Sequence, residues 1–263
     1  MSYPFGTPIM DIPNAEYHAA GGVSSSFTKA VARSTLLHAK KGNKVISDKA
    51  ARVGSALHSL ALEPEKGEVL AMHDSERGKV WTSFKEKSVE EGKIPLTIPD
   101  FEKCQKMVQS LHQHEDIHNL LTAQDRVCEA SLFAEYKGLT LKARPDLYTP
   151  NVMVDVKTTM SADPKQFMRQ FFDLGYDLQI AHYKLVGQLC GLQWTHFAFA
   201  CVEKEPPFAS NLFIVGGDTL SRAERIVEET LDKIKEDEGN EHPTTGWPRF
   251  TTINLPNYLK EDF

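Results

Sequence analysis

The chain contains 263 residues, of which 41% are hydrophobic, 25% charged and 9% aromatic. These values are typical of a globular protein and exclude a disordered chain, collagen and a coiled coil. Thirty Lys and Arg residues oppose 36 Asp and Glu residues, which gives a net charge of −6. This acidic balance argues against a protein that coats nucleic acid without specificity.

The charge is distributed unevenly along the chain. Residues 24–58 contain seven basic side chains and one acid, and residues 137–169 contain six basic side chains and three acids. Residues 221–241 contain four basic and eight acidic side chains, so much of the excess acid lies there. The basic stretches allow a polyanion to bind locally, although solvated helix faces explain the same pattern equally well.

The four cysteines share no short metal-ligand or redox spacing; they are Cys104, Cys128, Cys190 and Cys201. A chain of this length builds a core without disulfides, so a reducing cytoplasm is the expected compartment. The N-terminus lacks the pattern of a signal peptide, and no apolar run approaches the roughly 18 residues of a membrane span. We therefore expect neither export nor membrane insertion.

In chain order, the first half of the sequence predicts an arm followed by helices. The arm covers residues 1–23, and Ser24-Ser25-Ser26 supplies N-cap groups for a helix that runs to about Ala39. A second helix is predicted over Asp48–Glu63, and a third from near Pro99 to about Leu121. Residues 65–97 between them are weakly patterned and predict short helix and loop.

The second half changes from helical to alternating periodicity and back. Three successive strands, two helices, two more strands and a long acidic helix are predicted, over 127–136, 139–148, 152–157, 164–172, 176–192, 195–202, 208–215 and 219–237. We find no internal repeat and no linker. The expected fold class is α/β, as a single domain with an N-terminal helical elaboration.

Acidic and basic side chains converge on the predicted meander. Residues two apart in a strand share a face, so Asp155 and Lys157 project together. The preceding strand returns alongside, which brings Asp146 near its end to the same side. Two adjacent carboxylates repel each other, and a divalent cation such as Mg²⁺ removes that penalty. We expect a third oxygen ligand from the backbone carbonyl of Val156.

This arrangement suits phosphodiester hydrolysis. The cation activates water and neutralises phosphoryl oxygens, while Lys157 orients or deprotonates the water or stabilises the phosphorane charge. Lys142 and Arg144 alternate onto the side of Asp146 and provide cations for substrate phosphates. A surface ion pair between Asp155 and Lys157 remains the structural alternative.

Asp146 and Asp155-Val156-Lys157 on neighbouring strands resemble the PD-(D/E)xK nuclease motif, whose core is an αβββαβ unit. A wider set of residues resembles the nuclease domain of the RecE-type exonucleases (exodeoxyribonuclease VIII) of bacteria and phages. The resemblance spans about Tyr17 to Val202 and rests on Tyr17-His18-Ala19-Ala20, Ser24-Ser25-Ser26, Gly54-Ser55-Ala56-Leu57-His58, Glu129, Tyr176, Gln179 and Tyr183.

The resemblance implies a restriction-endonuclease-like PD-(D/E)xK core, with a mixed central sheet flanked by helices. It further implies a Mg²⁺-dependent exonuclease, for which Mn²⁺ substitutes, with one or two ions per active site. The implied substrate is linear double-stranded DNA, degraded from the 5′ end to leave 3′ overhangs for a single-strand annealing protein in recombination. A ring-shaped homo-oligomer, trimer or tetramer, in the cytoplasm of a bacterium or of a phage's host completes the expectation.

By the same resemblance, the chain is one nuclease domain over residues 1–263. It divides into the arm 1–23, a helical part 24–121, the catalytic sheet and helices 127–215, and a C-terminal helix and tail 217–263.

The resemblance also assigns roles to single residues. Asp146 and Asp155 bind metal, Lys157 serves the water, and His58 completes the metal site. Gln179 hydrogen-bonds a nucleotide or the attacking water. Glu129 holds a second metal, or else it is a solvent-facing strand residue, and Gly54 permits close approach of its helix to the sheet or to DNA.

Further candidates contact DNA. Tyr176 and Tyr183 share a helix face with Gln179 and stack on a base or contact phosphate, although such stripes also form cores. Ser26 and its neighbouring serines, with Arg33, form a 5′-phosphate pocket at a helix N-terminus, although ordinary capping explains the serines equally well.

Three alternatives remain open. The first is an endonuclease or helicase-associated nuclease with the same metal chemistry, and the second is a non-catalytic module that binds DNA ends. The third is a zinc protease, because His114-Glu115-Asp116-Ile117-His118 matches H-E-x-x-H. That motif lies close to a predicted helix end, and no further histidine follows it at metalloprotease spacing. We therefore interpret these residues as an exposed helix face rather than a zinc site.

Overall fold

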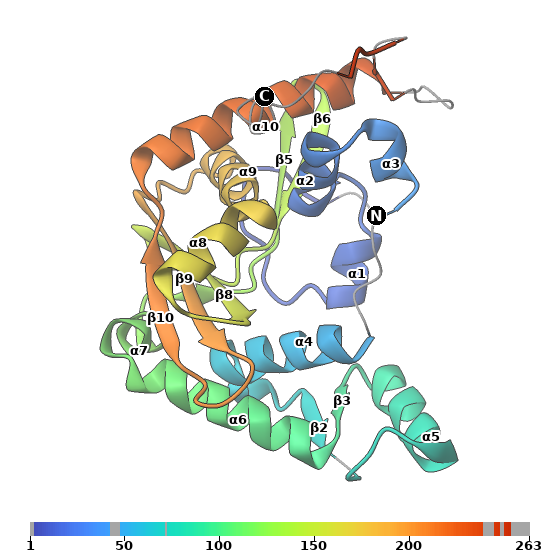
Figure 1. The fold of residues 1–263 in the computed structure, drawn as a ribbon, viewed down its shortest axis with the longest axis vertical. Helices are drawn as coiled ribbons and strands as arrows, with labels where there is room; N and C mark the ends of the chain where they lie inside the picture. Colours follow the sequence, from blue (N-terminus) through green and yellow to red (C-terminus); the bar gives the residue numbers. More distant parts are fainter. Residues whose placement is uncertain (1–2, 43–47, 72, 239–244, 248–249, 254–263) are drawn as a thin grey trace, which may run out of the picture.

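The structure, a computed structural model, describes residues 3–42, 48–71, 73–238, 245–247 and 250–253. Two layers of helices enclose a central sheet (Figure 1). The expected restriction-endonuclease-like α/β class with an N-terminal helical elaboration is confirmed. Much of the expected C-terminal tail lies outside the described residues.

The N-terminal part forms five elements: α1 (Asn14–Ala19), β1 (Val23–Ser24), α2 (Ser25–Arg33), α3 (Leu36–Lys40) and α4 (Asp48–Leu62). The single helix expected from Ser24 to Ala39 is wrong. Ser34 leaves the helical conformation, and the hydroxyl of Thr35 accepts a hydrogen bond from the backbone N–H of His38 to begin α3. Ser24 caps α2 in the same way, by accepting from Phe27 N–H.

Residues 64–122 contain more regular structure than their pattern predicts. They form η1 (Pro64–Lys66), β2 (Val69–Ala71), α5 (Gly78–Glu90), β3 (Ile94–Leu96), α6 (Ile98–Gln113) and α7 (Glu115–Thr122). The short strands β2 and β3 pair in parallel, which corrects the expectation of helix and loop alone. The third predicted helix is two helices, because His114 adopts an extended conformation between α6 and α7.

The central sheet has the order β10-β9-β8-β7-β4. Its strands are β4 (Val127–Cys128), β7 (Leu147–Tyr148), β8 (Val152–Thr159), β9 (His196–Glu203) and β10 (Ser210–Ile214). β8 and β9 run parallel over eight residue pairs, and the other neighbours are antiparallel. This mixed sheet is the one that the family resemblance implies.

The first two strands of the expected meander each divide between two sheets, so the expectation of three continuous strands is wrong. A second sheet, β1-β6-β5, contains β5 (Leu132–Tyr136) and β6 (Leu139–Ala143). The division falls at Glu129 on one strand and at Arg144-Pro145-Asp146 on the other. Glu129 has a φ of 51°, and Pro145 has no N–H to donate to a ladder.

Two helices follow β8, namely α8 (Pro164–Asp173) and α9 (Tyr176–Leu189), and a third, α10 (Gly217–Glu236), follows β10. Their positions match the expected helices closely. In the described part of the chain, no helix combines the length and the apolar character that crossing a membrane requires.

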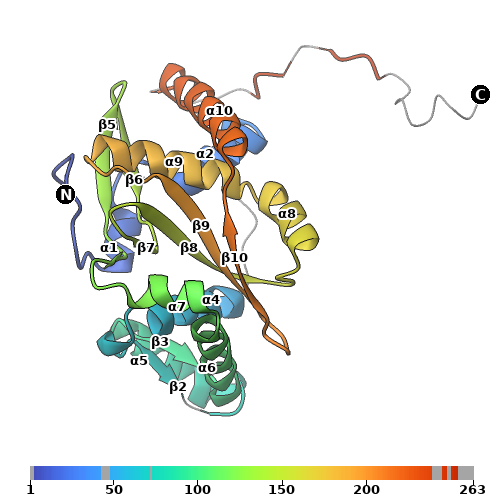
Figure 2. The same cartoon turned by 90° about the vertical axis from the view of Figure 1, so that its left-hand side faces the viewer.

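Alternation along β8 and β9 sends side chains into two separate cores. Val154 and Val156 pack toward α4 and α6, whereas Phe197 and Phe199 pack toward α8 and α9. Figure 2 shows these helices on opposite sides of the sheet. Asp155 and Lys157 therefore face the α9 side, as the two-residue period of a strand predicts. The division of residues 1–263 as one domain stays a prediction.

Gly187 of α9 gives a stability prediction. A Cβ at this position overlaps the buried indole ring of Trp194, whereas a Cβ at Gly54 meets no heavy atom of the described residues within 4 Å. We expect Gly187→Ala to lower the free energy of unfolding by about 1–3 kcal/mol. Gly54→Ala is the matched control, and we expect it to raise that free energy by up to about 1 kcal/mol because alanine favours a helix.

Urea unfolding of both variants measures the two changes. Equal free energies of unfolding for Gly187→Ala and the wild-type protein would contradict the close contact with Trp194. The open space at Gly54 also corrects part of an expectation: this glycine is not needed for close approach of α4 to the sheet.

Candidate active site

The candidate site begins where β7 stops pairing with β8. The antiparallel register places Leu147 opposite Val154. If the two strands continued to pair for two more residues, Pro145 would lie opposite Val156. Proline cannot donate the hydrogen bond that the carbonyl of Val156 requires there. Both backbone polar groups of Val156 consequently find side-chain partners.

Asp146 and His58 are these partners. Asp146 Oδ2 accepts a hydrogen bond of 2.7 Å from the Val156 N–H. The Nε2 of His58, on α4, lies 2.8 Å from the Val156 carbonyl oxygen. A hydrogen bond in that position fixes the ring with Nδ1 toward the carboxylates. The backbone of one strand residue thus aligns two side chains from distant parts of the sequence.

His58, Glu129 and Asp146 form a group whose ligand atoms lie within 4.8 Å of one another. His58 Nδ1 is 3.6 Å from Asp146 Oδ1 and 3.9 Å from Glu129 Oε1. Glu129 reaches this group from the left-handed backbone conformation at the break between β4 and β5, where its N–H donates to the Asp146 carbonyl at 3.1 Å. An uncommon conformation of this kind in a non-glycine residue is often found at functional sites.

Asp155 lies beside this group and is fully buried. Its Oδ1 accepts a hydrogen bond of 2.7 Å from Gln179 Nε2, and its Oδ2 is 2.5 Å from Lys157 Nζ. Despite that ion pair, Oδ2 has no hydrogen bond of regular geometry with any described residue. Asp155 and Lys157 are therefore an interior pair, and the surface ion pair considered from the sequence is excluded by burial.

The carboxylates of the site lack sufficient positive charge nearby. Burial and the charge of Asp146 raise the pKa of Asp155, although Lys157 opposes the shift. Burial and Asp146 also raise the pKa of Glu129. Burial alone would lower the pKa of the Lys157 ammonium, but Asp155 and Asp146 outweigh it and raise that pKa. A further cation among these groups would lower their mutual repulsion.

The residues present fit a divalent cation. One imidazole nitrogen and two carboxylates face a common point, and the buried Asp155 Oδ2 beside them lacks a regular hydrogen bond. Oxygen-rich sets with one imidazole bind Mg²⁺ or Mn²⁺. His58, Asp146 and Glu129 are the residues that would hold the ion, with Asp155 next to them and the Val156 carbonyl oxygen in contact with His58.

Lys29 extends the site in a way that the sequence analysis missed. Its Nζ donates a hydrogen bond of 3.1 Å to Gln179 Oε1, while the other end of the same amide holds Asp155. Lys29 and Lys157 both lie over the ring of Tyr176, at 5.6 and 5.1 Å from its centroid. Burial and the charge of Lys157 lower the pKa of Lys29 to about 8. The basic stretch 24–58 was the available clue, but charge alone did not single out Lys29.

Lys142 turns away from the acids, whereas Arg144 holds the N-terminal arm and also lies close enough to Glu129 for their charges to interact. Lys142 Nζ is buried against the carbonyl oxygens of Tyr17, His18 and Ala20, at the end of α1. Arg144 stacks on the ring of Tyr17, at 4.1 Å from its centroid, and donates to the Ile12 carbonyl at 2.9 Å. Both cations fasten the N-terminal arm to the sheet. The expected position beside the acids is corrected for Lys142, whereas Arg144 also interacts with Glu129.

Three other candidates lie outside the group of metal-ligating side chains. The Arg33 guanidinium donates to the carbonyl oxygens of Phe172 and Asp173 at the end of α8, so it caps a helix in this structure. Ser26 is exposed in the first turn of α2. Tyr183 is buried on the α9 side, where burial and then the charges of Asp155 and Asp146 raise its pKa. The predicted helix face of Tyr176, Gln179 and Tyr183 therefore borders the site.

The H-E-x-x-H segment does not form a metal site. His114 separates α6 from α7, and His118 Nδ1 lies 3.1 Å from Nδ1 of His112, on the preceding helix. Within the described residues, the group around His58 is the only set of three metal-ligating side chains that converge. Packing at a helix junction accounts for the motif.

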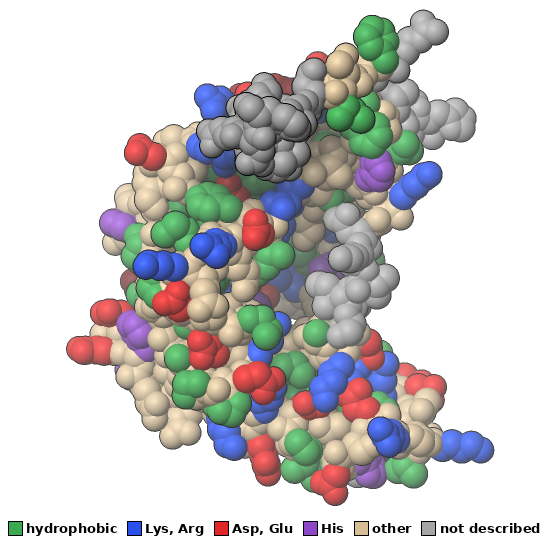
Figure 3. All heavy atoms as spheres, viewed as in Figure 1, with side chains coloured by type: hydrophobic (Ala, Val, Ile, Leu, Met, Phe, Trp, Pro, Cys, Tyr) green, Lys and Arg blue, Asp and Glu red, His purple; other side chains and the backbone are tan. Residues whose placement is uncertain are grey.

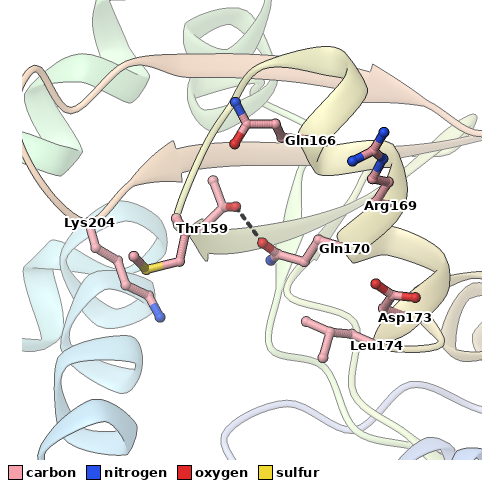
Figure 4. Close-up of a pocket in the computed structure, with 8 residues that line it drawn as sticks. Thr159, Gln166, Arg169, Gln170, Asp173, Leu174 and Lys204 are labelled. Carbon is pink, nitrogen blue, oxygen red and sulfur yellow. Dashed lines mark hydrogen bonds between the residues drawn. The ribbon is translucent and has the colours of Figure 1, made fainter.

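The surface carries a recess and a separate hollow. Figure 3 shows the surface hollowed between the part that carries α2 and α3 and the part that carries α4 and α5, with Lys or Arg side chains visible inside. A separate open hollow of about 560 Å³ lies between the end of β8, α8 and Lys204 (Figure 4). Its residues were not predicted, because no motif joins them in the sequence.

Residues 24–246 match the family described as a PDDEXK-like domain of unknown function (DUF3799). The chain is therefore a PD-(D/E)xK-like protein, and it belongs to the DUF3799 family. This membership confirms the resemblance to the PD-(D/E)xK nucleases and agrees with the RecE-type branch named from the sequence.

Solved structures support the same fold. A candidate exonuclease from Eubacterium rectale is 18% identical with a TM-score of 0.61, over 96% of this chain and 98% of that one. A phage-related exonuclease from Haemophilus somnus 129PT is 11% identical over 85% of this chain and 99% of that one, with a TM-score of 0.33 that is too low to add to the argument. No curated protein matches the chain in sequence.

The metal-ligating group gives a binding prediction. We expect His58→Ala to weaken Mn²⁺ binding at least about tenfold, since even losing an outer partner of a metal ligand commonly costs that much. Isothermal titration with Mn²⁺ measures the change. His196→Ala, which removes an exposed imidazole at the start of β9, is the control. Equal affinities in the wild-type protein and His58→Ala would rule out the proposed site.

Proposed function

We propose that the chain is a metal-dependent nuclease that hydrolyses DNA phosphodiesters. The observation that carries the proposal is the convergence of His58, Glu129 and Asp146 beside the Asp155–Lys157 pair in a PD-(D/E)xK-like fold. The family and the fold support a nuclease, and the site adds the chemical groups that such a reaction needs.

Each side chain has a distinct task in this proposal. A divalent cation, when bound, supplies Lewis acidity at the phosphate and a more acidic water. Asp146, His58 and Glu129 hold it, with Asp155 as a further ligand, and the Lys157 ammonium orients the attacking water or stabilises charge on the phosphate. Gln179 fixes the Asp155 carboxylate through its Nε2, so the carboxylate enters the reaction already oriented.

The finer assignment follows the RecE-type resemblance. We propose that the enzyme degrades one strand of linear double-stranded DNA from the 5′ end, with Mg²⁺ as the natural ion and Mn²⁺ as a substitute. The resulting 3′ overhangs would serve a single-strand annealing partner during recombination. A trimeric or tetrameric ring in the cytoplasm of a bacterium or a phage-infected host belongs to the same proposal.

Digestion of linear duplexes labelled separately at each end tests this function. We expect labels at 5′ ends to be released first with Mg²⁺ or Mn²⁺, closed circular duplex to stay intact, and a chelator to stop the reaction. Cutting of circular DNA would favour an endonuclease. Tight DNA binding without any metal-dependent product would favour a non-catalytic end-binding module.

Variants at the ion pair complete this test. Asp155→Asn and Lys157→Ala should each lower the rate by about 10²–10⁴-fold, the usual cost of losing a positioned acid or base. Lys165→Ala, on the exposed first turn of α8, is the charge-matched control for Lys157→Ala. Near-wild-type activity in both site variants, with unchanged thermal unfolding, would defeat the assignment.

Lys29 gives a separate prediction, because an ammonium only donates hydrogen bonds. It holds Gln179 Oε1 and therefore directs Nε2 to Asp155. We expect Lys29→Met to lower kcat about tenfold with little change in KM, and Lys29→Arg to retain part of the activity. The same Lys29→Met change should have no further effect in a Gln179→Ala background.

A double-mutant cycle of steady-state rates measures this coupling. Equal losses from Lys29→Met in the wild-type and Gln179→Ala backgrounds would show that Lys29 acts independently of Gln179.

A further inference from the structure

The open hollow beside β8 continues the catalytic face of the sheet. Asp155, Lys157 and Thr159 alternate onto one side of β8, so Thr159 lies roughly 7 Å beyond Lys157 along the same face. Thr159 lines the hollow of about 560 Å³, and Figure 4 shows its hydrogen bond to Gln170 across the floor. The residue of β8 that lines the hollow, Thr159, is therefore two positions from Lys157 of the ion pair.

Gln170 lies between the hollow and the site. Its Oε1 accepts a hydrogen bond of 2.9 Å from the Thr159 hydroxyl, and its side chain also lies close to the Tyr176 hydroxyl, whose pKa it lowers. Tyr176 in turn lies under the Lys157 ammonium. A group bound in the hollow would thus be separated from Lys157 by one aromatic ring.

The walls of the hollow carry two cations, Arg169 and Lys204. Arg169 projects from α8, and Lys204 follows β9, where its N–H donates to the Thr159 carbonyl at 3.0 Å. Neither side chain makes an ion pair with a described residue, and Asp173 is the one acid among the lining residues. Met160 and Leu174 add apolar surface at the rim. The lining is suited to an anion attached to a less polar body.

We propose that this hollow is a subsite for a nucleotide adjoining the scissile phosphate, with Arg169 and Lys204 on the neighbouring phosphate. The inference rests on the proposed nuclease function. The volume lies within the range of pockets that hold small organic ligands. A guanidinium and an ammonium on opposite walls bind phosphate oxygens by charge-assisted hydrogen bonds. The contact is independent of base identity, as a general nuclease requires.

The combined variant Arg169→Ala/Lys204→Ala tests the subsite. We expect KM for DNA to rise at least about tenfold and kcat to change little, because two charge-assisted contacts to the substrate are lost. The slope of log affinity against log salt should fall by about one. Lys165→Ala, which removes a charge from the same helix outside the hollow, should alter neither value by more than about twofold. Circular dichroism and thermal unfolding verify the fold of each variant.

Substrates with one neutral linkage locate the phosphate. A single methylphosphonate replaces the first, second or third linkage 3′ of the scissile bond, and a further substrate carries a 5′-hydroxyl end in place of the 5′-phosphate. The KM penalty of the double variant should disappear for one of these substrates and persist for the others. That result also tells whether an internal phosphate or the terminal phosphate occupies the hollow.

Two failures are distinguishable. If the wild-type protein degrades no DNA with either metal, the proposed function fails. If the wild-type protein is active but the double variant keeps the wild-type KM and salt slope, the subsite is overturned. A penalty that persists for every neutral-linkage substrate likewise overturns it, since the two cations then act at a distance.

Discussion

The site depends on one interruption in strand pairing. Continued pairing of β7 with β8 would bring Pro145 opposite Val156, and proline has no N–H for the Val156 carbonyl. Buried backbone groups require partners, and here the partners are the Asp146 carboxylate and the His58 imidazole. The two side chains that satisfy the open edge of the strand are consequently two of the three that would hold a cation. The hydrogen bonds that complete this edge of the sheet are therefore also those that position Asp146 and His58.

This arrangement also joins the two halves of the molecule. His58 comes from α4, which packs on one core, whereas Gln179 and Tyr176 come from α9, which packs on the other. β8 contacts both sets, through Val156 on one side and through Asp155 and Lys157 on the other. Polar side chains from both helical layers therefore converge at β8. None of them has to lie unpaired in the apolar cores, where a charge without a partner is costly.

The sequence predicted the type of most elements and the chemistry of the site. It was less successful in predicting where individual strands and helices begin and end. The two-residue period placed Asp155 and Lys157 on one face, and the RecE-type resemblance brought His58 to Asp146, which no local spacing indicates. The break of β6 from β7 was missed because Val127–Tyr136 and Leu139–Tyr148 each alternate continuously. Periodicity cannot tell which sheet a strand joins. The contacts of Lys142 and Arg144 with the N-terminal arm were missed for a related reason, since the carbonyl groups involved lie 122 to 132 residues away.

The fastening of the arm has its own consequence. Lys142 gathers three carbonyl oxygens at the end of α1, and Arg144 covers Tyr17 only two positions before Asp146. Residues 12–20 thus serve as a brace for the metal-ligating corner, although they contribute no reactive group. Shortening or rebuilding this segment would leave the buried Lys142 and the half-buried Arg144 without their carbonyl partners, two to four positions from Asp146. Residues 12–20 therefore support the position of Asp146 although they contribute no ligand or reactive group.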